Sequence, residues 1–387
     1  MQAALEGLVV LDLTNFLSGP YCTMLLGDMG AEVIKVERPD GGDDARRMPP
    51  FVEGPKGRTS QPFAIWNRNK RSVTADLKQA GDVAFVRRLA ARADILVENF
   101  RPGTLDRLGL GWEPLRAANS RLIWCSISGF GQTGPWAGHG GLDMMAQGMS
   151  GLMAGNGPPE GEPYRLPVAI TDVTAGMYAA IAVLGAVQAR HRTGEGQRID
   201  QSLFEAGVSL GVYEAAHVFA HGTRPQRLGQ LHRGSAPYRV FRTQDGYLTL
   251  GASKEKFWRS LCGIIGRPEL AEDARFRTNA DRVANNAALV EILQAALAQR
   301  PCAHWLEAFG AAGIPSEPVL SYDEALAHPQ GRARDLVVPF EDAERGSLPH
   351  LAPPVRLEGT PAVIRRRAPD LGEHDAEIRA WLAAQEG

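Results

Sequence analysis

Short hydrophobic runs alternate with helical patterns through the first third of the chain. Residues 8–13 (LVVLDL) and 31–37 (AEVIKVE) predict buried strands, and residues 20–30 (PYCTMLLGDMG) predict a helix between them, with Pro20 in its first turn. The same rhythm predicts a helix at 82–93 and further strands at 72–77, 94–100 and 121–128. This alternation predicts a parallel, doubly wound sheet, because parallel neighbours need crossover connections. Ligands of such sheets bind at the carboxyl ends of the strands.

The pattern changes twice in the rest of the chain. Residues 142–222 are largely helical, broken by a Gly- and Pro-rich loop at 154–163. The stretch after Asp172 is apolar nearly all round, which predicts a helix buried in a core or against another subunit. Near residue 235, two alternating strands around Asp245-Gly246 predict a hairpin, and amphipathic helices follow it.

These elements predict an α/β protein of two domains. At 387 residues the chain is longer than one core usually supports. Residues 1–225 are expected to form the first part of a large Rossmann-like domain. Residues 226–325 are expected to form a smaller α+β domain, and the C-terminal segment 326–387 to return to the large domain.

The composition is that of an ordinary globular protein, with 44% hydrophobic and 22% charged residues. Lys and Arg (42) nearly balance Asp and Glu (44), so no global field draws the chain toward nucleic acid or an anionic membrane. The four cysteines form neither a C-x-x-C pair nor a zinc spacing, which predicts no metal site and a reducing compartment. No basic leader opens the chain, and no uninterrupted apolar stretch reaches the roughly 20 residues of a membrane span. We expect a cytoplasmic protein without nucleic-acid or membrane partners.

One stretch matches a nucleotide-binding motif in letters only. Residues 129–134 (GFGQTG) fit G-x-G-x-x-G and follow a predicted strand, but PWAGHGG comes next instead of a helix. No acid closes a following strand about 20 residues on, as a dinucleotide site requires. A nicotinamide oxidoreductase therefore stays a minor alternative. The chain holds no G-x-S-x-G, H-E-x-x-H or P-loop motif.

Basic residues cluster at 66–78 and 98–109, each beside a predicted strand. One such cluster is typical of a solvated edge. Two clusters near strand ends of the same sheet favour a ligand that carries phosphate groups.

Asp172 stands just before the long apolar run. Asp is among the preferred N-caps, which predicts a capping role. Helix-terminal amides also lower the pKa of a carboxyl group, so the same position suits a reactive carboxylate. The local pattern leaves both roles open, and with them a non-catalytic acyl-CoA-binding protein in which Asp172 is only a cap.

Several stretches together resemble the class III CoA-transferases, the CaiB–BaiF family. The likeness spans nearly the whole chain and implies an α/β fold, an interlocked homodimer, and acyl-CoA as substrate with no tightly bound cofactor. The stretches are 10–39 (VLDLTNFLSGPYCTMLLGDMGAEVIKVERP), 67–78 (NRNKRSVTADLK), 94–110 (DILVENFRPGTLDRLGL), 128–135 (SGFGQTGP), 142–153 (LDMMAQGMSGLM), 172–206 (beginning DVTAGMYAA) and 371–374 (LGEH).

The resemblance implies that Asp172 is the nucleophile that relays CoA from an acyl-CoA donor to a free carboxylic acid. Succinyl-CoA and a small dicarboxylate such as itaconate, mesaconate, malate or glutarate are the preferred pair. The implied CoA-binding residues are Leu17, Ser18, Arg38, Lys78, Asn99, Phe100, Arg101, Arg107 and Asp143. Candidate substrate contacts are His139, Arg165, Gly234 and Ser235, the last two in a segment (HRGSAP) that takes the place of a family glycine loop.

Two leucines separate this chain from related activities. Leu17 stands where formyl-CoA transferases of the family carry glutamine, which disfavours formate and oxalate. Leu142 stands where the α-methylacyl-CoA racemases carry a histidine before the aspartate that matches Asp143. Racemization is therefore the alternative to CoA transfer.

Overall fold

The computed structural model describes residues 3–55, 57–343 and 345–384. The chain divides into two compact units. The first contains Met1–Met153, Arg165–Phe219 and Pro329–Gly387, and the second contains Ala154–Tyr164 and Ala220–His328. The chain therefore leaves the first unit twice and returns to it twice.

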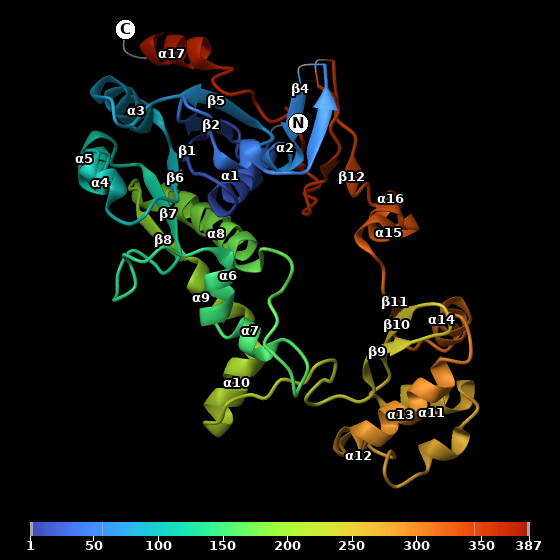
Figure 1. Ribbon diagram of the computed structural model, residues 1–387. Helices are drawn as coiled ribbons and strands as arrows, with labels where there is room; N and C mark the ends of the chain where they lie inside the picture. The colour runs from blue at the N-terminus through green and yellow to red at the C-terminus, as the bar shows by residue number, and fades with distance from the viewer. Residues whose placement is uncertain (1–2, 56, 344, 385–387) are drawn as a thin grey trace. The chain divides into compact units, whose positions relative to one another are not determined.

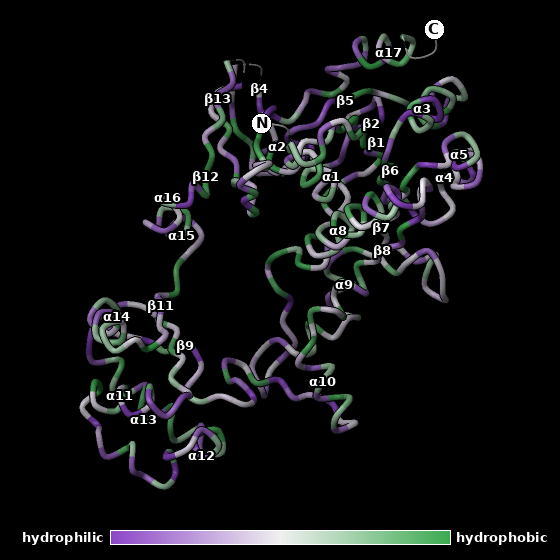
Figure 2. The backbone as a smooth tube through the Cα atoms, turned by 180° about the vertical axis from the view of Figure 1, so that it is seen from behind, coloured by the Kyte–Doolittle hydropathy of each residue, from purple (hydrophilic) through white to green (hydrophobic). Residues whose placement is uncertain are grey.

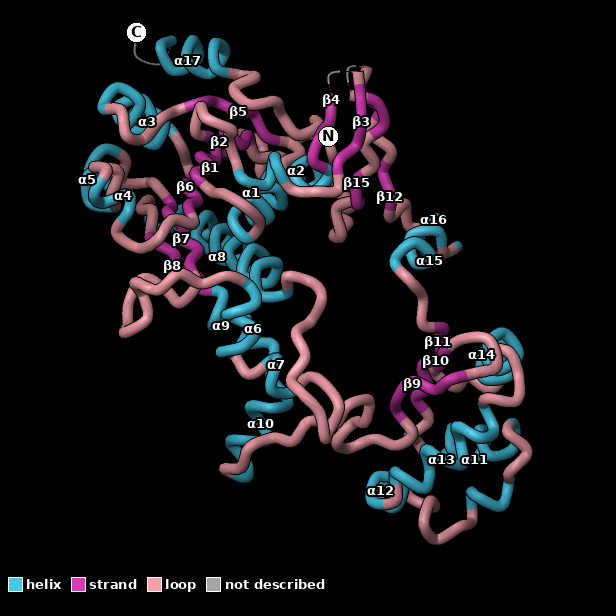
Figure 3. Tube along the Cα trace, viewed as in Figure 1, coloured by secondary structure: helices cyan, strands magenta, loops and turns pink. Residues whose placement is uncertain are grey.

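A six-stranded sheet forms the centre of the first unit, in the order β5-β2-β1-β6-β7-β8 with every neighbouring pair parallel (Figures 1 and 3). The chain builds the sheet outward from β1 in one direction and then from β6 in the other. Ligands of such sheets bind at this point of reversal, beyond the carboxyl ends of the two strands. The predicted parallel, doubly wound sheet is confirmed. Its strands are β1 (Val9–Leu13), β2 (Glu32–Glu37), β5 (Lys70–Thr74), β6 (Ile95–Glu98), β7 (Ile123–Ser128) and β8 (Arg198–Ser202).

Helices cover both faces of this sheet. On one face Val10 belongs to a hydrophobic cluster with residues of α1 (Ser18–Asp28), α8 (Ile170–Thr193) and α9 (Leu203–Leu210). On the other face Leu11 belongs to a cluster with residues of α3 (Ala80–Arg92), α5 (Trp112–Ala118) and α17 (Asp375–Ala384). Successive residues of a strand point to opposite faces, so a strand buried on both sides reads as a continuous hydrophobic run.

The edge strand β8 is the element that the sequence pattern misses. It lies in a region that reads as helical, and its residues RIDQS are mostly polar. Only Ser202 of this strand is buried. An edge strand has one unpaired side and tolerates polar residues, so it lacks the hydrophobic run that identifies its neighbours.

Helix α8 is long and apolar enough to cross a membrane by length and composition (Figure 2). Half of its apolar window is buried inside the protein, where Ala175, Ala179 and Val183 join the hydrophobic cluster of the sheet. This pattern is typical of the core helix of a globular domain.

The second unit has its own small sheet and core. β9 (Tyr238–Arg242) and β10 (Tyr247–Gly251) pair antiparallel around the predicted turn, where Thr243 N–H donates to the Gly246 carbonyl at 2.9 Å. The predicted hairpin is confirmed, and β11 (Ser316–Pro318) pairs with β10. Its helices are η2 (Pro268–Ala271), α11 (Glu255–Ile264), α12 (Asn279–Ala284), α13 (Asn286–Leu297), α14 (Cys302–Ala311) and α15 (Tyr322–Ala327).

Shorter elements complete the chain. They are η1 (Asp44–Arg47), β3 (Phe51–Gly54), β4 (Gly57–Ser60), α2 (Gln61–Trp66), α4 (Thr104–Arg107), α6 (Asp143–Met149), α7 (Leu152–Gly155), α10 (Val212–His221), α16 (Pro329–Ala333), β12 (Val337–Val338), β13 (Glu341–Asp342), β14 (Gly346–Ser347) and β15 (His350–Leu351).

Candidate active site

Asp172 is the third residue of α8 and does not cap it. The N-cap is Ala169, which has no side chain that can hydrogen bond, and the helix begins at Ile170. The predicted capping role of Asp172 is therefore wrong, because α8 starts two residues before the aspartate.

A carboxylate from another helix supplies the missing cap. Asp143 is the first residue of α6, and its Oδ1 accepts hydrogen bonds from the Thr171 N–H at 2.9 Å and from the Thr171 hydroxyl at 2.8 Å. Its Oδ2 accepts from Gln147 Nε2 at 2.7 Å. Gln147 is fully buried, and its Oε1 accepts from the Leu166 N–H at 2.9 Å, which also fixes the segment that leads into α8. Asp143 thus satisfies a free N–H of the first helical turn, and Asp172 is left available.

Ser18, the first residue of α1, lies close enough to Asp172 for its hydroxyl to act on the carboxyl group. Burial and, to a smaller extent, the charge of Asp143 raise the pKa of Asp172 from 3.8 to about 7, and the Ser18 hydroxyl opposes the shift. The expectation that helix-terminal amides lower this pKa is wrong, because loss of solvent outweighs the helix dipole at this position.

A glycine one turn after Asp172 allows α8 to lie so close to α1. A Cβ on Gly176 would stand 2.6 Å from the Ser18 carbonyl oxygen and 3.2 Å from the Tyr21 ring. Only glycine fits such an approach without displacing backbone. Gly176 therefore sets the distance between Asp172 and Ser18.

Asn99 fixes the loop between β1 and α1 from the next strand of the sheet. Its Oδ1 accepts from the Asn15 N–H at 2.8 Å, and its Nδ2 donates to the Asn15 carbonyl at 2.7 Å. Asn99 thus holds the β1–α1 loop in place, and its contact with CoA stays a prediction. Leu17, at the end of this loop, is the N-cap of α1 and directly precedes Ser18.

A cavity of about 410 Å³ opens at the carboxyl ends of β1, β2, β5 and β6. It brings together four residues that the sequence places near the ligand, Arg38, Lys78, Phe100 and Arg107. The remaining walls are mostly apolar, with Leu13, Val36, Ala75, Leu77 and Leu108 among them. A mostly apolar cavity with a few cationic groups suits a ligand that combines a flat or aliphatic body with phosphates.

The cations of this cavity differ in how strongly the protein already holds them. Arg38 is paired with Asp44, which also accepts from Arg47 at 2.7 Å. Arg107 donates to the Thr104 hydroxyl at 3.1 Å. Within the described part of the chain, Lys78 forms no ion pair. Lys78 is therefore the cation most available to an anionic ligand.

Much of the first basic cluster is structural. Arg68 is buried and pairs with Asp28 at 2.7 Å, and Lys70 is fully buried and pairs with Asp12 at 3.0 Å. The prediction that this cluster as a whole faces phosphate is wrong for these two residues, since their charges are neutralised inside the protein. Of the basic residues in this cluster, only Lys78 lines the cavity.

Arg101, His139 and Arg165 are among the predicted ligand residues that do not line this cavity. Arg101 lines a small separate recess with Glu98 and Gln132. The ring of His139 packs on Trp136, with centroids 4.6 Å apart. Arg165 is exposed, and its nearest polar contact is a weak one to the Leu166 carbonyl at 3.4 Å.

Gly234 and Ser235 belong to the second unit. The Gly234 carbonyl accepts from Asn279 Nδ2 at 2.9 Å, and the Gly234 N–H donates to His232 at 3.1 Å. The hydrogen bond from Asn279 thus fixes the turn at Gly234 to the start of α12.

The glycine motif at 129–134 leads into turns and not into a helix. Its Gln132 N–H donates to both oxygens of Asp200 on β8, at 3.1 and 3.0 Å. These contacts tie the loop to the edge strand, and the motif lacks the helix N-terminus that holds a pyrophosphate. Among the described residues no group of three or more His, Cys, Asp or Glu side chains is placed to bind a metal ion.

Comparison with known proteins gives a consistent result. Residues 5–375 match the model of a family described as CoA-transferase family III. The chain is 39% identical over 381 residues to a succinate–glutarate CoA-transferase of Agrobacterium fabrum, covering 98% of this chain and 95% of that protein. It is 40% identical over 383 residues to an acetyl-CoA:oxalate CoA-transferase of Acetobacter aceti, with 98% and 96% covered.

The fold has an equally close match among solved structures. A crystal structure of a CaiB/BaiF family protein from Brucella suis superimposes with a TM-score of 0.90 at 39% identity, over 99% of this chain and all of that one. The resemblance noted in the sequence is confirmed by these matches.

Proposed function

The chain belongs to CoA-transferase family III, and we propose that it moves CoA from succinyl-CoA to a small dicarboxylic acid through a covalent intermediate on Asp172. The observation that carries the proposal is the position of this carboxylate. It is partly buried, lies beside the Ser18 hydroxyl, and has a pKa raised to about 7. A partly desolvated carboxylate of this basicity is a better nucleophile than one in water, and near neutral pH a large share of it is ionised.

Both halves of the reaction use the same two bond exchanges. The Asp172 carboxylate attacks the thioester carbonyl of succinyl-CoA, the C–S bond breaks, and CoA leaves as the thiolate while a mixed anhydride forms. The thiolate then attacks the aspartyl carbonyl of the anhydride, which releases succinate and leaves CoA as a thioester on Asp172. The thioester energy is retained throughout.

The acceptor reverses these steps. Its carboxylate attacks the aspartyl thioester and expels CoA thiolate, and a second anhydride forms. Attack of the thiolate on the acceptor's carbonyl gives the new acyl-CoA and returns Asp172 as a carboxylate. No net proton is consumed, so the site has only to stabilise the oxyanions.

The N-terminus of α1 is suited to that task. Ser18 and Gly19 are its first two residues, and their backbone N–H groups have no acceptor within the described residues. Unpaired amides at a helix N-terminus bind negative charge. We assign these two amides to the oxyanions that form beside Asp172.

The cavity of Lys78, Arg38, Phe100 and Arg107 is the proposed place of the CoA nucleotide. Its apolar walls fit the adenine and pantetheine, and its cations fit the phosphates. Asn99 and Asp143 act indirectly in this scheme, the first on the β1–α1 loop and the second on α8. Roles for Arg101, His139, Arg165, Gly234 and Ser235 in binding substrate remain proposals from the sequence.

Glutarate is the first acceptor to test among the four acids named above. The Agrobacterium relative is named for succinate and glutarate. The Acetobacter relative is named for acetyl-CoA and oxalate, another dicarboxylate. Leu17 precedes Ser18 and presents an aliphatic side chain near the thioester, which favours an acid with a longer apolar spacer than oxalate.

Racemization of an α-methylacyl-CoA is the less supported activity. It needs a second acid or base on the far side of the α-carbon. Leu142 holds the position of that histidine, and its side chain cannot exchange a proton. Both named relatives are transferases.

A homodimer in the cytoplasm is the proposed working form. Large hydrophobic side chains are exposed along three neighbouring helices of the isolated chain, including Leu142, Met144, Ile181 and Val208. An exposed apolar surface of this kind marks a protein interface. All four cysteines are free, as expected in a reducing compartment.

Trapping the intermediate tests the proposal. The protein is incubated with succinyl-CoA and treated with hydroxylamine or borohydride, and the modified peptide is identified by mass spectrometry. Modification confined to Asp172, together with CoA transfer to glutarate, is the expected result. Asp172→Asn should keep its fold and lose both, while Glu113→Gln, which changes an exposed acid on α5, should keep both. Loss of α-deuterium from a branched acyl-CoA without CoA exchange would indicate racemization instead.

A further inference from the structure

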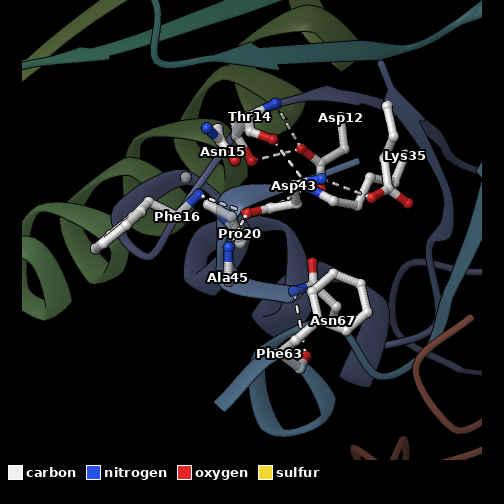
Figure 4. A network of polar contacts seen from close by, with 12 residues as sticks. Asp12, Thr14, Asn15, Phe16, Pro20, Lys35, Asp43, Ala45, Phe63 and Asn67 are labelled. Atoms are coloured by element: carbon white, nitrogen blue, oxygen red, sulfur yellow. Dashed lines mark hydrogen bonds and ion pairs between the residues drawn. The ribbon is translucent and has the colours of Figure 1, made fainter. Parts of the chain in front are cut away.

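Four buried charged side chains, Asp12, Lys35, Asp43 and Lys70, bond to the β1–α1 loop or to the start of α1, and the first three are labelled in Figure 4. Lys70 pairs with Asp12 at 3.0 Å, and Lys35 pairs with Asp43 at 2.8 Å. Burial raises the pKa of Asp12, but the charges of Lys35 and Lys70 overcome this and hold it well below its usual range. Burial lowers the pKa of Lys35, and Asp12 and Asp43 overcome that effect, so the pKa is raised. The pKa of Lys70, by contrast, is lowered to about 8, because burial and the charge of Lys35 outweigh the attraction of Asp12. The cluster therefore holds Asp12 and Lys35 in their charged forms, and Lys70 is the member that loses its proton most easily.

Each member of the cluster also bonds to the loop or to the helix that follows it. Asp12 accepts from the Thr14 N–H at 2.9 Å and from its hydroxyl at 2.5 Å. Lys35 donates to the Thr14 carbonyl at 2.8 Å, and Asp43 accepts from the Phe16 N–H at 3.1 Å. Lys70 donates to the Pro20 carbonyl in the first turn of α1 at 3.0 Å.

The conformation held in this way is an unfavourable one. Phe16 has a φ of 73°, in the left-handed region that non-glycine residues rarely adopt, and its side chain is 45% exposed. No burial of the Phe16 ring compensates for that backbone. The surrounding hydrogen bonds must therefore impose the conformation.

Stability does not explain such a cluster. Replacing a buried ion pair by uncharged groups of similar size is often neutral or stabilising, because desolvating two charges costs as much as their attraction returns. Some of its contacts go elsewhere, from Asp12 to Thr23, from Asp43 to Ala45 and from Lys70 to Asn67. Most of them converge on residues 14–20, the segment that carries Ser18.

We propose that the Asp12–Lys70 and Lys35–Asp43 pairs position the catalytic loop, holding residues 14–17 so that the N-terminus of α1 meets Asp172. The four are positioning residues, since none touches the reacting carboxylate. The inference rests on the proposed role of Asp172 as nucleophile.

The test removes one pair without leaving an unpaired charge. In the double variant Asp12→Asn with Lys70→Met, the shapes remain and both charges go. This pair is chosen because neither residue lines the CoA cavity, whereas Asp43 does. Thermal unfolding, the Kd for CoA and the single-turnover rate of Asp172 acylation by succinyl-CoA are measured for each protein.

We expect the double variant to unfold at the same temperature as the parent chain and to bind CoA equally well, but to acylate Asp172 about a hundredfold more slowly, as displacement by about 1 Å can cause. The matched control is Asp28→Asn with Arg68→Met. It removes an equally buried pair from the other end of α1, with 2% of each side chain exposed, and should keep the parent rate.

Distinct outcomes overturn distinct statements. A double variant that acylates Asp172 within about twofold of the parent rate overturns the positioning role, since ordinary substitutions change rates by that much. A loss of rate in the control that equals the loss in the double variant overturns it as well. Failure of the parent chain to acylate Asp172 at all overturns the proposed function, and the inference with it. If the double variant does not fold, Thr14→Val keeps all four charges and removes only the loop hydroxyl. Because Thr14 lines the CoA cavity, its acylation rate is compared with the parent's at saturating succinyl-CoA. About tenfold slower acylation there supports the role, as loss of one strong hydrogen bond implies, and an unchanged rate overturns it.

Discussion

Asp143 Oδ1 accepts a hydrogen bond from the backbone N–H of Thr171 at 2.9 Å. The carboxylate of Asp143 therefore caps α8, the helix that carries Asp172. This contact also has an electrostatic effect on Asp172. The capping carboxylate brings a negative charge near Asp172, and that charge adds to burial in raising the pKa of Asp172. The same contact therefore fixes the nucleophile in space and sets the pH at which it ionises.

The rate of Asp172 acylation should rise with pH through about 7. Only the ionised carboxylate attacks the thioester, and its pKa is raised from 3.8 to about 7. The single-turnover rate with succinyl-CoA, measured from pH 5.5 to 8.5, checks this. A rate that is level over the whole of this range, as an unperturbed carboxyl group would give, contradicts the assignment.

Asp143→Asn should move the midpoint of this profile to lower pH. The amide keeps an oxygen that can accept from Thr171, so the helix stays capped, while the charge that raises the pKa of Asp172 is lost. Burial remains, so the midpoint should stay above that of an exposed carboxyl group. A midpoint that does not move, with α8 intact by circular dichroism, would show that Asp143 does not act through its charge.

Gly176→Ala should lower the rate of acylation. A Cβ at this position would stand 2.6 Å from the Ser18 carbonyl oxygen, so α8 and α1 must separate. Overpacking of this kind costs about 1 to 3 kcal/mol of stability, and misplacement of Asp172 from Ser18 should cost roughly 10- to 100-fold in rate. Urea unfolding and single-turnover acylation measure the two effects.

Gly263→Ala is the control for that substitution. Gly263 lies in α11 of the second unit, is exposed, and has no atom within 4 Å of the added Cβ. Alanine should stabilise the helix here by about 0.5 to 1 kcal/mol and leave the rate unchanged. Equal loss of rate in both variants would mean that neither reports on the contact between α1 and α8.

The sequence predicts the sheet well because its strands are buried on both faces. Runs such as residues 8–13 and 31–37 show this burial directly, whereas the polar edge strand β8 gives no such pattern. Within those runs, Asp12, Lys35 and Glu37 are charged residues that lie buried, and a charged residue in a buried strand must find a partner. That signal points to the cluster, but the sequence alone does not pair Asp12 with Lys70 across 58 positions.

Asp172 shows the other limit of sequence analysis. Its residue type and position fit an N-cap, and the family motif fits a nucleophile, so local pattern cannot separate them. The distinction depends on Asp143, which lies 28 positions before Thr171 in the sequence and contacts α8 only through the tertiary fold. The basic cluster at 66–78 fails for the same reason, because burial of Arg68 and Lys70 is a tertiary property.

Lys78→Gln should weaken binding of CoA. Lys78 lines the cavity and has no ion pair within the described residues, so its charge is available to a phosphate. Loss of one charge-assisted hydrogen bond costs about 1.5 to 3 kcal/mol, or roughly 10- to 150-fold in Kd. Calorimetric titration with CoA and with 3′-dephospho-CoA would show which phosphate it contacts, since the variant's defect disappears for the ligand that lacks that phosphate.

Lys256→Gln controls for the change in net charge. Lys256 is an exposed residue of α11 in the second unit, away from the cavity lining. The Kd for CoA should be unchanged in this variant and should depend on salt as in the parent. A defect equal to that of Lys78→Gln would assign the effect to overall charge.

The stability of the first unit should fall as the pH drops from about 6.5 toward 4, because of His350. This histidine of β15 is 1% exposed, and neither ring nitrogen has a hydrogen-bond partner within the described residues. Burial, with a smaller effect of the Arg68 charge, lowers its pKa from 6.5 to about 4. The pKa of His350 is thus lower in the folded than in the unfolded chain. Between these two pKa values the unfolded chain binds a proton that the folded chain does not bind. The free energy of unfolding is therefore highest above pH 6.5 and falls as the pH drops toward 4. The loss between pH 7 and 5 should be about 2 kcal/mol.

His350→Leu should unfold at the same or higher urea concentration at pH 7, since it removes two unpaired buried nitrogens, and should show a smaller loss of stability at pH 5. His139→Leu, which replaces an exposed histidine, should keep the parent's loss, and a parent and His350→Leu that lose the same stability would contradict the assignment.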